Sequence, residues 1–344
     1  MRMSEVALSQ ESQTFLRGSA IVAVVLIHFF ASLSHVYTRP IVGEFFIFFD
    51  QAARFSVPLF IMLSGFGLTK KYLDKELVFK EFFERRVFKL FPLFFIWSLF
   101  SFCVLATIPA WNIPYTALPS VLSQLVLGSS DYQLYFLPLI FQLYILFPVL
   151  LKLFRAAPKT ILSLAFGLQV ALFVFFSSNA QTKFIPFFLT DHGQYIFFLS
   201  WIFYFVCGMW LAAYGFPTKL KRWLPAFAGC GLIAAYLISS NAIAHAIDPL
   251  FALKVTRLAI LPWIILCTIT LVLFTQSSYW HKLPSVVQKL VSWMGAHSYL
   301  IFLSHTLLLR IIFAFVRETV SPLALIEVFA AWAICVVVSL KLKE

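Results

Sequence analysis

The sequence predicts an all-α membrane protein, a polytopic helix bundle with about ten transmembrane helices. Two observations support this fold class. Apolar residues make up 62% of the 344-residue chain and charged residues only 12%, whereas roughly 25% of the residues in a soluble domain are charged. The apolar residues also gather in runs of about twenty, the length that a helix needs to cross the hydrocarbon core of a bilayer.

Ten such runs follow one another, with no internal repeat and no linker between them. Their approximate bounds are 15–36, 45–69, 87–108, 132–154, 159–177, 194–215, 224–240, 253–276, 296–316 and 322–340. We therefore expect a single integral membrane domain over residues 1–344, with no appended soluble domain.

The basic residues between the runs predict the orientation in the membrane. The connection after the second run is rich in them, with Lys70, Lys71, Lys75, Lys80, Arg85, Arg86 and Lys89. The next connection, 109–131, has no Lys or Arg. From there on, connections rich in basic residues alternate with connections that have few or none, Lys183 being the exception on the outer side. By the positive-inside rule, this alternation places both termini in the cytoplasm.

Composition also excludes several classes of function. The net charge of +12 is spread over short connections between apolar runs, and no nucleic-acid-binding module is present. The five cysteines lie in five different runs without metal-ligand spacing, so we expect neither a disulfide framework nor a metal site. The sequence also lacks the Gly-rich phosphate loop, the GxSxG nucleophile elbow and the HExxH zinc motif.

The first run, FLRGSAIVAVVLIHFFASLSHV, carries ionisable residues inside the membrane. Arg17 and His28 are eleven residues apart, which leaves them about 20° apart around a helix, and His35 returns to the same face. Burying an ionisable side chain in the hydrocarbon core costs free energy, so such a residue usually has a functional role. Histidine is suited to taking a proton from a hydroxyl, and arginine to binding carboxyl or phosphate groups. A second interpretation stays open, in which Arg17 anchors at the headgroups and His28 packs between helices.

A basic cluster precedes the third run. Arg85, Arg86 and Lys89 stand one to four residues apart, at the predicted cytoplasmic face. They are candidates for binding the phosphates of a nucleotide-like donor. Ordinary positive-inside anchoring is the alternative.

Three residues are candidates on the substrate side: His35, near the predicted outer surface, Asp50 and His305. Asp50 stands one turn before Arg54, so it either pairs with this arginine or faces a cavity. His305 lies mid-membrane in the ninth run and either lines the same cavity as His28 or packs against a backbone carbonyl. Pro58, in the second run, is expected to kink its helix.

These stretches resemble acyltransferase family 3, a family of membrane proteins. In FLRGSAIVAVVLIHFF an Arg is followed by ten residues and a His, as in the family's first span. FSVPLFIMLSGFGL resembles its second span, ERRVFKLFPLF its third, YFLPLIFQLYILFP its fourth and SYLIFLSH its late span. The ordered set covers most of the chain. WIFYFVCGMWLAAY resembles members that modify extracellular polysaccharides such as poly-N-acetylglucosamine.

The resemblance implies a multi-pass O-acyltransferase of the cell membrane. It would move an acyl group, acetyl or another short one, from cytoplasmic acyl-CoA to a sugar hydroxyl of a cell-surface polysaccharide or glycolipid. His28 and Arg17 are the implied catalytic residues. Arg86 and Lys89 match the family's Arg-x-x-Arg pair, with Lys in second place, which keeps the charge but loses the bidentate fork.

The implied partners are the bilayer, the acyl-CoA and the acceptor, with no nucleic acid. No cofactor is expected to be bound permanently, and acetyl-CoA is the first expectation for the co-substrate. One alternative is a polysaccharide or glycolipid transporter without acyl-transfer activity, although the two related halves common in transporters are not evident. Another is a structural membrane subunit in which Arg17 and His28 only hold helices together.

Overall fold

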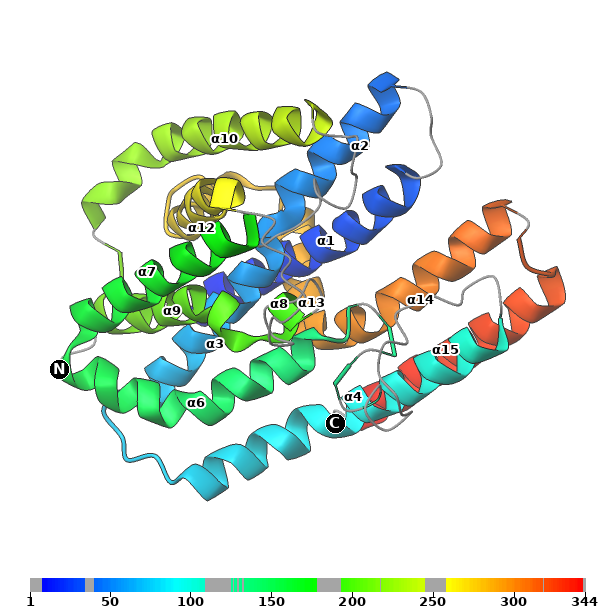
Figure 1. The fold of residues 1–344 in the computed structure, drawn as a ribbon, viewed down its shortest axis with the longest axis horizontal. Coiled ribbons are helices and arrows are strands. Elements are labelled where there is room, and N and C mark those ends of the chain that lie inside the picture. Colours follow the sequence, from blue (N-terminus) through cyan, green and yellow to red (C-terminus); the bar gives the residue numbers. More distant parts are fainter. Residues whose placement is uncertain are drawn as a thin grey trace. The chain divides into compact units, whose positions relative to one another are not determined.

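The structure is a computed structural model, shown as a ribbon in Figure 1. It describes residues 8–34, 40–108, 125, 127–128, 130–131, 133–177, 193–216, 218–244, 258–317 and 319–342. Within these ranges, all regular secondary structure is helical.

Each of the ten apolar runs corresponds to a helix or to consecutive helices. In chain order they are α1 (Gln10–Ser34), α2 (Pro40–Ala52) with α3 (Ser56–Tyr72), α4 (Phe79–Thr107), α6 (Phe136–Ala156), α7 (Pro158–Ser177), α9 (Ile202–Tyr214), α10 (Leu224–Ala244), α12 (Leu261–Thr275), α14 (Ser298–Arg317) and α15 (Pro322–Lys341). Shorter elements are η1 (Ala53–Phe55), α8 (Gly193–Ile196), η4 (Phe198–Ser200), η5 (Thr218–Trp223), η6 (Leu258–Ile260), η7 (Trp280–Lys282) and α13 (Ser285–Ala296).

Among the described residues, 8 helical stretches are long and apolar enough to cross a membrane, and α9 is a shorter apolar helix. The predicted all-α membrane bundle is thus confirmed. The count of ten spans and the cytoplasmic placement of both termini stay predictions.

The second run is helical from Pro40 to Tyr72 but is interrupted by the 3-10 turn η1. Pro58 lies just beyond this turn and has no backbone N–H, so it offers no helical hydrogen bond to the carbonyl of Arg54. The interruption thus precedes Pro58, and α3 continues through it to Tyr72. The kink expected at Pro58 stays a prediction.

The helices form two compact units. Unit 1 contains Met1–Glu76 and Leu146–Ser298, and unit 2 contains Leu77–Ile145 and Tyr299–Glu344. The boundary between them falls inside α6.

In unit 1, α3 packs closely against α9. A Cβ atom added to Gly65 would lie 2.2 Å from the carbonyl oxygen of Phe205, and one added to Gly208 would lie 1.9 Å from that of Met62. Glycine at both positions lets the two backbones touch. The buried core around this contact also includes α1 and α12 and is formed by Leu8, Leu16, Ala20, Leu59, Met62, Leu63, Phe66, Leu211, Ala212 and Val272.

In unit 2, side-chain hydrogen bonds join α4, α14 and α15. The indole N–H of Trp97 on α4 donates to the hydroxyl of Ser339 on α15 over 2.9 Å, and both side chains are buried. The hydroxyl of Tyr299 on α14 donates to the carbonyl of Leu90 on α4 over 2.6 Å. Polar groups buried in the membrane are thus satisfied between helices, as hydrocarbon surroundings require.

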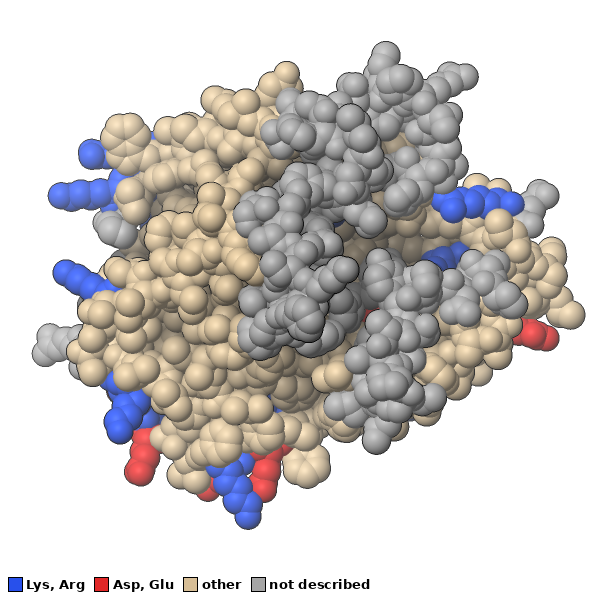
Figure 2. Space-filling view, in the orientation of Figure 1, with Lys and Arg blue, Asp and Glu red and all other residues tan. Residues whose placement is uncertain are grey.

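Large apolar side chains are exposed along several helices, among them Leu164 on α7, Leu232 on α10 and Leu323 on α15, each more than 60% exposed. In Figure 2 the described residues are uncharged over most of the visible face, and Lys, Arg, Asp and Glu lie toward its margins. This distribution is typical of a protein that contacts lipid around its sides.

Candidate active site

The two ionisable residues of the first span lie on one uninterrupted helix, α1. Because no break separates Arg17 from His28, the predicted spacing holds. They share one face and are about 16 Å apart along the axis. Both side chains are half-buried and have polar or ring contacts. One ionisable stripe therefore runs along α1 within unit 1.

The position of Arg17 is set by tight packing against α13. A Cβ atom on Gly18 would lie 1.9 Å from the carbonyl oxygen of Val291, and one on Gly295 would lie 1.9 Å from that of Thr14. Two glycines, one on each helix, thus bring the backbones together next to Arg17. The sequence reasoning did not identify α13, whose exposed Trp293 and Leu290 suit the membrane interface.

Aromatic side chains of α1 and α2 gather around Phe30, on α1 beyond His28. Phe30, two residues on, lies with its ring 5.2 Å from that of Phe49 and 5.8 Å from that of Phe46 on α2. The hydroxyl of Ser32 donates to the carbonyl of His28 over 2.8 Å. Because residues two positions apart point to different sides of a helix, this cluster packs α1 against α2 beside the face that carries His28.

Asp50 is fully buried and pairs within its own segment. The guanidinium of Arg54 lies 2.8 Å from its carboxylate, and the side-chain amide of Gln51 donates to it over 2.8 Å. This is the pairing that the one-turn spacing predicted. A role for Asp50 toward substrate stays a prediction.

The predicted phosphate-binding residues lie at the start of α4, in unit 2. Arg85 is exposed and forms an ion pair with Glu81 over 2.9 Å. The guanidinium of Arg86 lies 5.7 Å from the ring centres of both Phe82 and Tyr144. These rings hold the guanidinium in place without using its N–H donors. Lys89 is exposed, on the same stretch of helix.

His305 is buried in α14 of unit 2, only 4% exposed. Its Nδ1 atom lies 3.0 Å from the carbonyl oxygen of Ile301 and 2.9 Å from that of Phe302. Since a carbonyl oxygen only accepts, Nδ1 carries the ring hydrogen. This contact agrees with the packing interpretation. A cavity shared with His28, which belongs to unit 1, stays a prediction.

Sequence reasoning missed a buried polar group beside His305. The carboxylate of Asp131 lies 2.8 Å from the guanidinium of Arg310 and accepts a hydrogen bond from the hydroxyl of Thr306 over 2.9 Å. An arginine inside the ninth apolar run was the available signal, because a charge at that depth needs a partner.

The structure says less about the remaining predicted features. His35 lies outside the described residues. No group of three or more His, Cys, Asp or Glu is placed to hold a metal ion within the part of the chain that the structure describes. All five cysteines are free.

The described helices define a multi-pass membrane protein with ionisable side chains inside its spans, which is typical of membrane enzymes and of transporters. A family model described as an acyltransferase domain matches residues 13–342, nearly the whole chain. The chain therefore belongs to acyltransferase family 3, and it is a membrane acyltransferase that transfers groups other than aminoacyl groups. No curated protein and no solved structure matches the chain.

Proposed function

We propose that this acyltransferase moves a short acyl group from cytoplasmic acyl-CoA to a sugar hydroxyl of a polysaccharide or glycolipid at the cell membrane. The observation that carries the proposal is the placement of Arg17 and His28 on one face of the continuous helix α1. The family match supports acyl transfer and spans both residues. The identity of donor and acceptor is our inference.

The chemistry follows from the side chains available. The imidazole of His28 removes the proton from the acceptor hydroxyl, and the oxygen attacks the carbonyl carbon of the thioester. A new C–O ester bond forms, the C–S bond breaks, and the CoA thiolate leaves and takes up a proton. Arg17, which is always charged, binds a negatively charged or polar part of a substrate on the same face of α1.

The basic residues at the start of α4 bind the donor's phosphates. Arg86 is the best placed, because the rings of Phe82 and Tyr144 hold its guanidinium. Among the described residues it forms no ion pair, whereas Arg85 pairs with Glu81. Lys89 adds a second positive charge nearby on the helix. Arg85 contributes less, since Glu81 already offsets part of its charge.

The test is acyl-CoA consumption by the purified protein in lipid nanodiscs, with and without N-acetylglucosamine oligosaccharides as acceptors. We expect slow thioester hydrolysis without acceptor and faster turnover with acceptor. His28→Ala abolishes both, whereas His297→Ala, at a partly buried histidine directly after α13, retains both. A protein that binds and consumes no acyl-CoA contradicts the proposal.

A further inference from the structure

Two phenylalanine rings are stacked at the start of α4, beside the residues proposed to bind the donor's phosphates. The ring centres of Phe79 and Phe83 lie 5.6 Å apart, and the ring planes make an angle of 17°. Phe79 is 46% exposed, whereas the neighbouring Phe82 is only 2% exposed and lies against the guanidinium of Arg86. The Phe79–Phe83 pair therefore presents aromatic surface that the mechanism proposed above does not use.

The charged residues around this pair show that it does not face hydrocarbon. Lys80, Glu81, Glu84 and Arg85 are all exposed within the same two turns of α4. Because charged side chains are unfavourable in the hydrocarbon core, this end of the helix lies in water or among headgroups. An exposed apolar group with a charged border is typical of a binding surface.

The aromatic pair and Arg86 share one face of α4. At 100° per residue, Phe79, Phe83 and Arg86 lie within about 60° of one another, and Arg86 follows the two rings by one to two turns. The carboxylates of Glu81 and Glu84 belong to the opposite side of the helix. This face of α4 therefore offers a flat apolar surface followed by a positive charge.

The order of these groups matches the parts of a nucleotide, in which a ribose joins a flat base to phosphates. Stacking of one base on aromatic side chains strengthens binding by a factor of roughly 5 to 150. Phosphate oxygens accept charge-assisted hydrogen bonds from a guanidinium group. A lipid headgroup offers a phosphate but no flat ring, so it would use only the Arg86 end of this face.

From these observations we propose that the Phe79–Phe83 pair binds the adenine ring of the donor by stacking, next to the phosphates that Arg86 binds. The two phenylalanines then recognise the donor and take no part in the chemical step. This inference rests on the proposed function, because it adds a contact with the base to the acyl-CoA site proposed there.

The first experiment measures the Kd of adenosine bisphosphate, the nucleotide end of CoA, for the full chain in phosphatidylcholine nanodiscs. Phe79→Leu/Phe83→Leu keeps apolar side chains that favour a helix but removes the flat rings. We expect this double variant to raise Kd at least tenfold. The matched control is Phe88→Leu, because Phe88 is 76% exposed on the opposite side of the same helix, and its Kd should stay within a factor of two of wild type. A double variant with the wild-type Kd overturns the proposal and leaves the rings to lipid headgroups.

A second probe, the matching ribose bisphosphate without a base, separates stacking from a general effect on the site. The wild type should bind it at least tenfold more weakly than adenosine bisphosphate, and the double leucine variant should bind it as the wild type does. Arg86→Ala should weaken the binding of both probes. Equal losses for both probes in the double leucine variant would mean that the rings act through folding or through Arg86, and base recognition would be rejected.

Enlarging the aromatic surface provides a test that does not depend on loss of binding. Phe79→Trp offers a larger flat ring at the more exposed position of the pair, so it should bind adenosine bisphosphate at least as tightly as the wild type. Its affinity for the ribose probe should be unchanged. Weaker binding of adenosine bisphosphate by Phe79→Trp, at an unchanged unfolding temperature, would contradict the stacking contact.

The same measurements distinguish failure of this inference from failure of the proposed function. Binding that depends on the base, without any consumption of acyl-CoA, would contradict acyl transfer and leave the base contact in place. Consumption of acyl-CoA with the same KM in the wild type and the double leucine variant would contradict only the base contact.

Discussion

The carboxylate of Asp131 and the guanidinium of Arg310 form an ion pair of 2.8 Å inside unit 2, with side-chain exposures of 0% and 15%. Arg310 belongs to α14 and Asp131 to the segment before α6, and Thr306 donates a second hydrogen bond to the same carboxylate. One buried contact thereby joins residues that are 179 positions apart in the sequence.

Removing one partner of this pair should destabilise the protein strongly. Asp131→Asn leaves the buried guanidinium without its carboxylate, at a cost of about 3–5 kcal/mol. Thermal unfolding in detergent measures the loss. The double variant Asp131→Asn/Arg310→Met should be more stable than Asp131→Asn alone, and strictly additive losses would contradict the structural pairing.

Tight packing beside Arg17 gives the second prediction. Gly18→Ala forces a Cβ atom to within 1.9 Å of the carbonyl oxygen of Val291, and overpacking of this kind costs roughly 1–3 kcal/mol. Because Arg17 is the adjacent residue, acyl-CoA turnover should fall as well. The control is Gly67→Ala, where a Cβ meets nothing within 4 Å and helix propensity gains up to about 1 kcal/mol. Equal unfolding temperatures for the two variants would contradict the α1–α13 contact.

Arg86, at the start of α4, gives the third prediction, which concerns binding of the donor. Arg86→Ala should raise KM for acyl-CoA about tenfold, as expected for the loss of a charge-assisted phosphate contact. Added salt should shrink the difference from wild type. Lys159→Ala removes an exposed basic residue at the start of α7 and should leave KM unchanged.

Glu81 allows the same site to be tested in the opposite direction. Glu81→Gln frees the guanidinium of Arg85 from its ion pair, so KM for acyl-CoA should fall by a factor of about two to five. A KM that rises in Glu81→Gln and is unaffected in Arg86→Ala would exclude this face of α4 as the donor's phosphate site.

The sequence was sufficient to predict the fold class and the placement of Arg17 and His28 on one face of a helix. Both depend on properties that are local in the chain. A twenty-residue apolar run is long enough to be a spanning helix, and two residues eleven positions apart share a face on any uninterrupted helix. The pairing of Asp50 with Arg54 is local in the same sense, because the two stand one turn apart.

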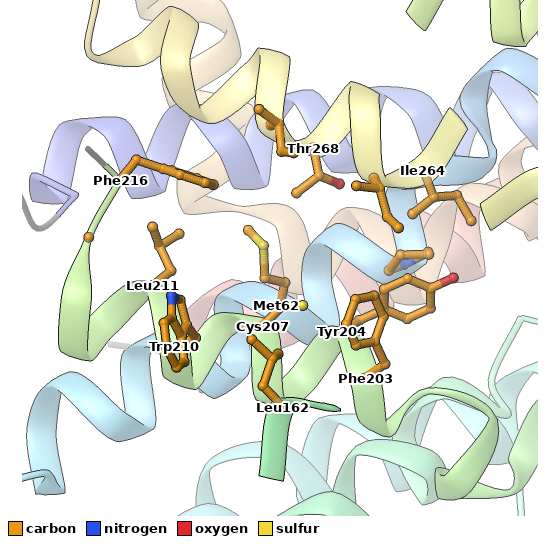
Figure 3. A pocket seen from close by; sticks show the side chains of 14 residues that line it. Met62, Leu162, Phe203, Tyr204, Cys207, Trp210, Leu211, Phe216, Ile264 and Thr268 are labelled. Carbon is orange, nitrogen blue, oxygen red and sulfur yellow. The ribbon is translucent and has the colours of Figure 1, made fainter. Parts of the chain in front are cut away.

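Contacts between distant segments could not be predicted in this way. The Asp131–Arg310 pair depends on how α14 meets the segment before α6, and the packing of Gly18 on Val291 depends on α13. An apolar pocket in unit 1 is a further example (Figure 3), since the residues that line it come from α3, α7, α9 and α12, and each of these helices is only an apolar run in the sequence. The spacing of residues shows which side chains share a face of a helix, but not which other helix packs against that face.

The most direct test of the central claim is thioester hydrolysis and acyl transfer by His28→Ala, compared with wild type at equal amounts of folded protein. Unfolding temperature and elution on size exclusion establish that the variant is correctly folded. If His28 removes the proton from the acceptor, transfer to oligosaccharide should fall at least a hundredfold, while binding of acyl-CoA stays within a factor of about three. A folded His28→Ala protein that transfers acyl groups at the wild-type rate would contradict the account.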